Sequence, residues 1–362
     1  MRIRHRRAWR GNRRVISWGV GTLVLGLALA SASVAVARTS AKAPLPYPKT
    51  AKTCGTSSIK MAFVSPLGNT YGQAIEKGIR QYLKPCKNVS ISNFDTGFDS
   101  QKQFNVIQDI TTQKTFKAIL FLPLDGVGVV PAVEGAIKAG IQVVNFNNPL
   151  GNDFTTARVH IRGQAGTVIE PQYQRGIWEA QIAALACKGD NNCKIGYIAG
   201  VIGISAELAI KLGFDKELKK HSNMHLTTYQ GGGQYLPDPS RTVAQNMLQA
   251  HRDLDVIVAS GDQMIRGAEI AVADANRQKQ VKLIGLGGSQ IGVAAVKAGR
   301  WFGTVITQPL DQGRLTGKIA LDHVLNPKLP SQGVNPFTYT RRSPLLTKET
   351  LAKSKFVPQW SG

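Results

Sequence analysis

The stretch that decides the fold runs from Ser58 to Asn148 and begins SIKMAFVSPLGNTYGQAIEKGIRQYLK (residues 58–84). Short apolar runs at 59–64, 89–91, 118–122 and 141–146 predict strands, and amphipathic segments at 71–83, 101–114 and 127–139 predict the helices between them. Strands that alternate with helices of this length form a parallel sheet that is covered on both faces. Because ligands bind beyond the carboxyl ends of such strands, the residues to examine are 65–71, 95–98, 123–125 and 145–148.

The same alternation continues through the second half of the chain. Strands are predicted at 194–199, 226–229, 256–259, 281–285 and 303–307, and helices at 166–186, 206–218, 240–251, 264–276 and 291–298. These are too many strands for one core, and a chain of 362 residues is longer than a single domain commonly is. We therefore expect two similar α/β halves that divide near residues 160–163.

The N-terminal region has the pattern of an export signal. Residues 2–14 contain seven arginines and no acidic residue, and residues 15–34 are apolar and small. Ala35-Val36-Ala37 fits a small-x-small cleavage site, so we predict a signal peptide at 1–37, a linker at 38–57 and a location in the periplasm or another extracytoplasmic space. A retained membrane anchor is the alternative, and the Arg13-Arg14 pair leaves both the Sec and the twin-arginine export routes open.

The formal net charge of +23 at pH 7 first suggests a nucleic-acid partner. Part of this charge belongs to the signal arginines, and most lysines are placed singly; the dense spots are 216–220 and 341–342. No nucleic-acid-binding motif accompanies them. We therefore expect no nucleic-acid partner and interpret the charge as that of a secreted protein near an anionic envelope surface.

The four cysteines predict two disulfides in an oxidising compartment. Cys187 and Cys193 flank a short polar turn, whereas Cys54 and Cys86 precede two strands that would lie side by side. A four-thiolate zinc site is the alternative, but the sequence has no Cys-x-x-Cys pair. We expect no metal site.

Several segments together resemble a known family. These are SPLGNTY (65–71), the strand and turn at 118–125, ASGDQM (259–264), and 281–289 followed by 291–307. Their order and spacing are similar to those of the ribose/galactose class of type I periplasmic sugar-binding proteins, over roughly residues 59–348. The resemblance implies two doubly wound, Rossmann-like parallel-sheet lobes joined by three crossover strands near His160, Thr307 and Asn335. The N-terminal lobe would be 58–160 plus 308–335, and the C-terminal lobe 161–307 plus 336–362.

The resemblance also implies where a ligand would bind, in a cleft that closes by hinge motion. Its polar contacts and stacking aromatic rings align in the first lobe with Ser65, Asn69, Tyr71, Asn147 and Asn148. In the second lobe the aligned or adjacent positions are Tyr235, Asp262, Thr307 and Gln308. Structural roles are the alternatives: a turn for Asn69, packing for Tyr71 and Tyr235, and helix capping for Asp262 and, more strongly, Asp125.

The charged clamp of ribose-like members is largely missing from this sequence. The arginine of the helix at 206–214 aligns with Ile210, and an asparagine and an aspartate of the family align with Gly261 and Gly287. We therefore expect a neutral polyol, a modified sugar or a less hydroxylated molecule as the ligand.

The resulting prediction is a monomeric solute-binding protein of an ABC importer, which passes a sugar-like small molecule to a permease and needs no cofactor. Presentation of a ligand to a signalling receptor and binding of a non-carbohydrate solute are the alternatives. An enzyme is disfavoured because the sequence has no Gly-x-Ser-x-Gly, phosphate-binding or His-Glu-x-x-His motif. A transcription regulator is disfavoured by the signal peptide and the lack of a DNA-binding head.

Overall fold

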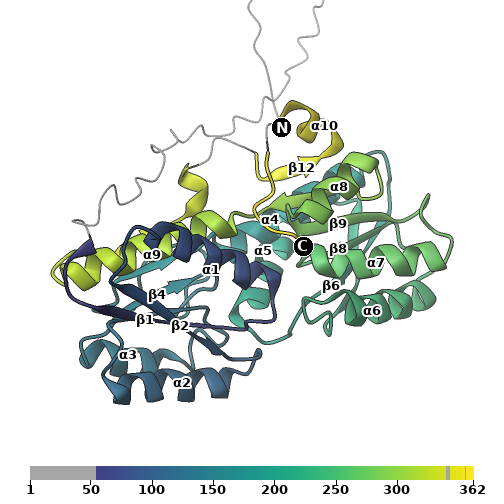
Figure 1. The fold of residues 1–362 in the computed structure, drawn as a ribbon. Helices are drawn as coiled ribbons and strands as arrows, with labels where there is room; N and C mark the ends of the chain where they lie inside the picture. Colours follow the sequence, from purple (N-terminus) through teal and green to yellow (C-terminus); the bar gives the residue numbers. More distant parts are fainter. Residues whose placement is uncertain (1–53, 340–342, 355) are drawn as a thin grey trace, which may run out of the picture. The chain divides into compact units, whose positions relative to one another are not determined.

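Two six-stranded sheets organise the fold (Figure 1). The structure is a computed structural model that describes residues 54–339, 343–354 and 356–362. The predicted signal peptide and the predicted linker up to residue 53 lie outside the described residues. Within the described ranges, no helix combines the length and the apolar composition needed to cross a membrane. By their contacts all described residues belong to a single unit, which contains both sheets.

Lobe 1 is built on a fully parallel sheet of order β11-β5-β4-β3-β1-β2. Its strands are β1 (Ile59–Ser65), β2 (Val89–Asp95), β3 (Ala118–Phe121), β4 (Gln142–Phe146), β5 (Gly166–Val168) and β11 (Gln332–Val334). Its helices are α1 (Thr70–Leu83), α2 (Ser100–Gln113), α3 (Val130–Lys138) and α9 (Pro309–Leu325). The buried side chains of β1 alternate between the two faces of the sheet. One set packs against α1 and α9 and the other against α2 and α3, which explains why the strand is an apolar run.

Lobe 2 repeats this plan with a sheet of order β12-β10-β9-β8-β6-β7, in which β12 alone pairs antiparallel. Its strands are β6 (Cys193–Ile198), β7 (Met224–Gln230), β8 (Val256–Ala259), β9 (Lys282–Gly287), β10 (Gly303–Ile306) and β12 (Leu345–Thr347). Helices α4 (Gln172–Ala186) and α5 (Ser205–Leu218) pack on one face. Helices α6 (Pro237–Ala250), α7 (Asp262–Asp274) and α8 (Gln290–Ala298) pack on the other, and α10 (Lys348–Lys353) follows β12. The predicted pair of doubly wound lobes is confirmed.

The chain passes between the lobes three times, after β5, after β10 and after β11. The second and third crossings begin after Ile306 and Val334, next to the positions expected at Thr307 and Asn335. The first crossing is not at His160, because β5 still pairs with β4 and the chain leaves lobe 1 only after Val168. The predicted helix at 166–186 was therefore wrong at its start. A strand of three residues is too short to give a periodic pattern.

The structure contains both expected disulfides, Cys54–Cys86 and Cys187–Cys193. Cys54 is fully buried in the core of lobe 1. The fold therefore begins before residue 58, and the last residues of the predicted linker belong to it.

Candidate functional site

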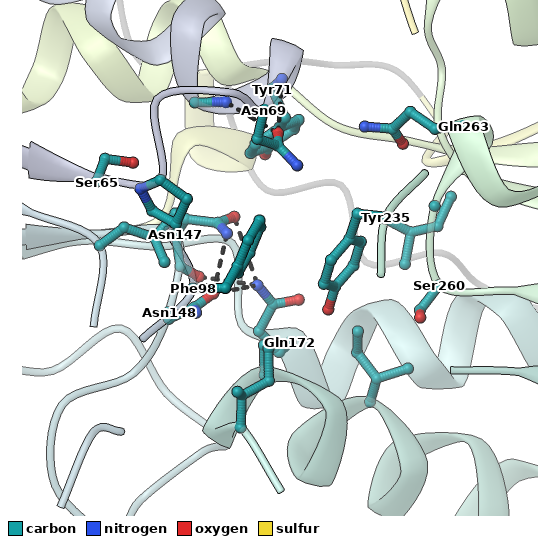
Figure 2. A pocket seen from close by; sticks show the side chains of 18 of the residues that line it. Ser65, Asn69, Tyr71, Phe98, Asn147, Asn148, Gln172, Tyr235, Ser260 and Gln263 are labelled. Carbon is teal, nitrogen blue, oxygen red and sulfur yellow. Dashed lines mark hydrogen bonds between the residues drawn. The ribbon is translucent and has the colours of Figure 1, made fainter. Parts of the chain in front are cut away.

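A pocket between the two lobes opens at the carboxyl ends of their strands (Figure 2). Lobe 1 lines it with Ser65, Pro66, Asn69, Tyr71, Gly72, Phe98, Leu122, Asn147 and Asn148. Lobe 2 lines it with Gln172, Arg175, Ile204, Ala206, Ile210, Tyr235, Ser260, Gly261, Gln263, Leu286 and Trp360. Six of the predicted site residues are thus brought together here: Ser65, Asn69, Tyr71, Asn147, Asn148 and Tyr235. Their contact with a ligand stays a prediction.

Asn69 is both a capping residue and a pocket residue. Its Oδ1 accepts hydrogen bonds from the backbone N–H groups of Tyr71 at 2.9 Å and Gly72 at 3.3 Å, which starts α1. The structural alternative considered from the sequence was a turn; the structure gives Asn69 a helix-capping role, which uses only the oxygen of its amide. The cap also fixes the first turn of α1, and Tyr71 of that turn lines the same pocket.

A cluster of amide side chains from both lobes lines the pocket (Figure 2). Nδ2 of Asn147 donates to Oδ1 of Asn148 at 2.9 Å, and Nε2 of Gln172 donates to the backbone oxygen of Asn147 at 2.9 Å. Asn147 has φ 61°, a left-handed conformation that asparagine tolerates better than most residues. The amides offer both donors and acceptors, as a hydroxylated ligand requires.

Phe98 and Tyr235 face each other across the pocket, one from each lobe (Figure 2). Their ring centroids are 5.9 Å apart and their planes differ by 17°. The hydroxyl of Tyr235 donates to Oε1 of Glu207 at 2.6 Å, and Ser260 donates to the same oxygen at 2.7 Å. Burial raises the pKa of the Glu207 carboxyl, against the lowering effect of these hydrogen bonds. Tyr235 is therefore held by a buried acid behind the pocket wall.

Arg175 of α4 brings a charge to the pocket that the sequence did not reveal. Its Nη2 donates to Oε2 of Glu170 at 2.8 Å and to the hydroxyl of Tyr71 at 3.0 Å, and its Nη1 donates to Oε1 of Gln172 at 3.0 Å. Burial raises the pKa of Glu170 although Arg175 lowers it, and burial raises the pKa of Tyr71 to about 12. The expectation of a pocket with little charge is corrected in part: an arginine is present, but it is paired with a buried carboxyl.

The side of the pocket formed by α5 is apolar. Ile204 precedes α5, and Ala206 and Ile210 belong to it; the last two are almost fully buried. Ile210 is the position that the resemblance aligns with an arginine of ribose-like proteins, and here it presents an aliphatic side chain to the pocket. The pocket therefore has amides on one side and aliphatic groups on another.

The family of the chain follows from a comparison of its sequence with family models. The model of a periplasmic binding protein domain matches residues 62–328. The chain belongs to this periplasmic binding protein family. The matched region contains both lobes up to the end of α9 and nearly all residues of the pocket.

Curated relatives of this periplasmic binding protein are named for sugars or for a sugar alcohol. A ribose import binding protein of Bacillus subtilis is 28% identical over 265 residues, covering 73% of this chain and 81% of the relative. A D-allose-binding periplasmic protein of Escherichia coli is 27% identical, with coverage of 71% and 81%. A xylitol-binding protein of Mycolicibacterium smegmatis is 25% identical, with coverage of 63% and 62%.

Solved structures support the fold of this periplasmic binding protein. An ABC transporter solute-binding protein from Bacillus halodurans with bound myo-inositol has a TM-score of 0.72 at 16% identity, covering 83% of this chain and 98% of that one. A periplasmic solute-binding protein from Actinobacillus succinogenes with bound D-allose has a TM-score of 0.69 at 20% identity, with coverage of 82% and 100%. At these identities the likeness concerns the fold.

Asp262 does not line the pocket of this binding protein, contrary to the prediction. Its Oδ2 accepts hydrogen bonds from the backbone N–H and the hydroxyl of Ser289 at 2.8 and 2.7 Å, and its Oδ1 accepts one from Thr304 at 2.7 Å. Burial raises the pKa of this carboxyl, against these lowering contacts. Asp262 lies within α7, where Gly261 is the N-cap, so its side chain connects α7 to neighbouring elements of lobe 2.

Thr307 and Gln308 also lie outside the pocket lining. The hydroxyl of Thr307 donates to the backbone oxygen of Gly287 at 2.8 Å, and the backbone N–H of Gln308 donates to Oε1 of Glu170 at 2.8 Å. Both residues belong to the second crossing, and the contact with Glu170 links it to the first crossing. Asp125 does not cap α3, although a capping role was favoured from the sequence: the N-cap is Val129, and Oδ1 of Asp125 accepts from the N–H groups of residues 127 and 128 in the turn before the helix.

Six polar or aromatic residues of the pocket were not predicted as site residues from the sequence: Phe98, Gln172, Arg175, Ser260, Gln263 and Trp360. Phe98 could have been predicted from the sequence, because it lies in the segment 95–98 that follows a predicted strand. Gln172 and Arg175 were hidden by the incorrect start of the helix at 166–186. Trp360 lies beyond the last predicted strand, and no local pattern connects it to the pocket.

Proposed function

We propose that this protein is an extracytoplasmic solute-binding protein of an ABC importer and binds a sugar or sugar-like small molecule between its lobes. The observation that carries the proposal is the pocket itself, where an amide cluster and two facing aromatic rings are contributed jointly by both lobes. Amides can bind hydroxyl groups, and aromatic rings can pack on the apolar face of a sugar ring. The names of the sequence relatives agree with this chemistry.

The ligand we expect is neutral and amphipathic. Arg175 is engaged by Glu170 at 2.8 Å, so neither charge requires a charged ligand group as a partner. Hydroxyl groups would lie against Asn147 and Gln172, whereas the aliphatic wall at Ile210 would exclude a hydroxyl group that has no partner there. A deoxy sugar or a short polyol meets these conditions better than a fully hydroxylated hexose does.

The first experiment is native mass spectrometry of the exported chain from residue 38, with disulfides intact. A thermal-shift screen then uses D-ribose, D-allose, xylitol, myo-inositol, D-arabinose, and the pair L-fucose and L-galactose. We expect at least one sugar or polyol to raise the melting temperature, and L-fucose to give a larger shift than L-galactose. Shifts only with non-carbohydrate solutes in a wider screen would contradict the sugar assignment.

Matched variants locate the binding in the pocket. Tyr235→Ala should clearly reduce the shift, because it removes one of the two facing rings. Leu185→Ala on α4 is the control, because Leu185 is exposed and is not part of the pocket lining. An undiminished shift in Tyr235→Ala would place the ligand elsewhere.

Import and export are tested in cells. Deletion of the gene should abolish uptake of the labelled ligand, and the Tyr235→Ala variant should restore it only in part at low ligand concentration. Normal uptake after deletion would favour presentation of the ligand to a receptor instead.

N-terminal sequencing of the exported protein tests cleavage after Ala37, and size-exclusion chromatography tests the expected monomer.

A further inference from the structure

Residues 356–362 contact both lobes and reach the pocket. They follow α10 in lobe 2, and Figure 1 draws them as the yellow segment that ends at the C mark. Trp360 of this segment is 5% exposed and lines the pocket. An almost fully buried tryptophan in an irregular segment needs specific partners on every side, and the structure provides them from both lobes.

The contacts with lobe 2 hold the backbone of the segment. The N–H groups of Gln290 and Ile291 at the start of α8 donate to the backbone oxygens of Trp360 at 3.0 Å and Ser361 at 3.1 Å. Nε1 of Trp360 donates to the backbone oxygen of Gly287 at 3.0 Å. A Cβ atom at Gly287 would lie 2.5 Å from the indole ring, so the strand end there has room for the ring only because the residue is glycine.

Each contact with lobe 1 involves at least one side chain. The ring of Trp360 meets the ring of Tyr71 edge to face, with centroids 5.3 Å apart. Nε2 of Gln359 donates to Oδ2 of Asp311 at 2.7 Å, and the N–H of Asp311 donates back to Oε1 of Gln359 at 3.2 Å. The hydroxyl of Thr70 donates to the backbone oxygen of residue 362 at 3.2 Å. The segment therefore touches α1 and the start of α9, both in lobe 1.

These two sets of contacts differ in the kind of groups involved. On the lobe 2 side the segment is held by three hydrogen bonds to backbone groups and by the buried indole. On the lobe 1 side it is held by side chains that a hinge motion can release. When the lobes separate, the segment would therefore remain on lobe 2, and the contacts of Trp360 and Gln359 with lobe 1 would break.

We propose that residues 356–362 form a clasp that favours the closed arrangement of the lobes and supplies Trp360 as a ligand-binding residue. The indole N–H is already bonded to Gly287, so Trp360 offers the ligand an apolar ring surface and no donor. It would contact the C–H groups of a sugar or polyol. The binding half of this inference rests on the proposed function, whereas the clasp does not.

Binding is tested with the panel solute that gives the largest shift in the wild-type protein. We expect Trp360→Ala to weaken its affinity by about tenfold or more, and Trp360→Phe to weaken it less, because phenylalanine keeps an aromatic surface. The change in tryptophan fluorescence on adding the solute should be lost in Trp360→Phe. A lower melting temperature with unchanged affinity and an unchanged fluorescence response would overturn the ligand-binding role.

The clasp is tested without ligand by small-angle X-ray scattering. The double variant Gln359→Ala/Trp360→Ala should have a larger radius of gyration than the wild type. Val357→Ala, at a residue that is 69% exposed in the same segment, is the control and should match the wild type. An equal radius in all three proteins would overturn the clasp.

If no panel solute binds the wild type, the proposed function and the role of Trp360 in binding fail together, and the scattering result still decides the clasp.

Discussion

The ring of Phe98 in lobe 1 stacks on the ring of Tyr235 in lobe 2, and both residues have left-handed backbones with φ 61° and 53°. Such conformations are uncommon for aromatic residues and cost free energy, so the surrounding structure must hold them. The two residues line the inner pocket and also a second, outer hollow of the cleft.

Truncation of either ring should weaken ligand binding while the fold is kept. We expect Phe98→Ala and Tyr235→Ala each to lower the affinity by about tenfold, since an aromatic contact contributes roughly 0.5–1.5 kcal/mol beyond its buried area. Isothermal titration calorimetry with the best panel solute measures this. Tyr235→Phe keeps the ring and loses only the bond to Glu207, so its affinity should lie between those of the wild type and Tyr235→Ala. Equal affinity in all variants would contradict the role of the pair.

Loss of Arg175 should strongly destabilise the protein, because Glu170 would be left buried without its cation. We expect Arg175→Met to lower the free energy of unfolding by about 3–5 kcal/mol, and the double variant Glu170→Gln/Arg175→Met to lose less than the two single variants together. Equilibrium urea unfolding measures the cycle. Arg241→Met is the control, since its pair with Asp274 is exposed and should contribute under about 1 kcal/mol. Additive effects of the two single changes would refute the coupling.

The raised pKa of Glu207 predicts a pH-dependent contribution to stability. Above the ordinary glutamate pKa of 4.5, the folded state holds the proton more tightly than the unfolded state does, so the free energy of unfolding falls as pH rises. Glu207→Gln removes this contribution, and its stability relative to the wild type should therefore increase as the pH rises above 4.5. Urea unfolding at several pH values measures the difference. Glu134→Gln, at an exposed position, is the control and should show no such trend. A stability difference between Glu207→Gln and the wild type that does not change with pH would contradict the raised pKa of Glu207.

The two disulfides should contribute unequally to stability. The Cys54–Cys86 bridge closes a sequence separation of 32 and the Cys187–Cys193 bridge one of 6. From the loss of loop entropy in the unfolded chain, we expect replacement of the first pair by serine to cost about 4 kcal/mol and replacement of the second to cost about 2 kcal/mol. Urea unfolding of the two double variants, beside the wild type, measures this. The reverse order would show that native packing outweighs loop length.

The sequence was sufficient for features that depend on neighbouring residues. The apolar run that forms β1 predicted a strand covered on both faces, and the position after that strand predicted that Ser65 and Asn69 would lie at the pocket. The disulfide Cys54–Cys86 followed from two cysteines that precede adjacent parallel strands. Each of these conclusions uses only the local pattern and the rule that parallel strands align their ends.

For Asp262 the prediction from the local pattern was wrong. Its position after a strand suggested a pocket residue, but its carboxyl is buried inside lobe 2, where it accepts three hydrogen bonds from Ser289 and Thr304. The direction of a side chain at a strand end depends on the elements packed around it. Likewise, β5 becomes a strand because β4 and β11 pair with it, since its own three residues carry no periodicity.

The sequence by itself determined the two α/β halves, their disulfides and the edge of each sheet at which a ligand would bind, because these follow from local periodicity and spacing. Only the tertiary structure decided which side chains meet across that edge. Phe98 reaches Tyr235, Arg175 reaches Tyr71, and Trp360 reaches the same pocket from the far end of the chain. These contacts depend on how the three crossings orient one lobe against the other, which is a property of long-range packing and leaves no local pattern in the sequence.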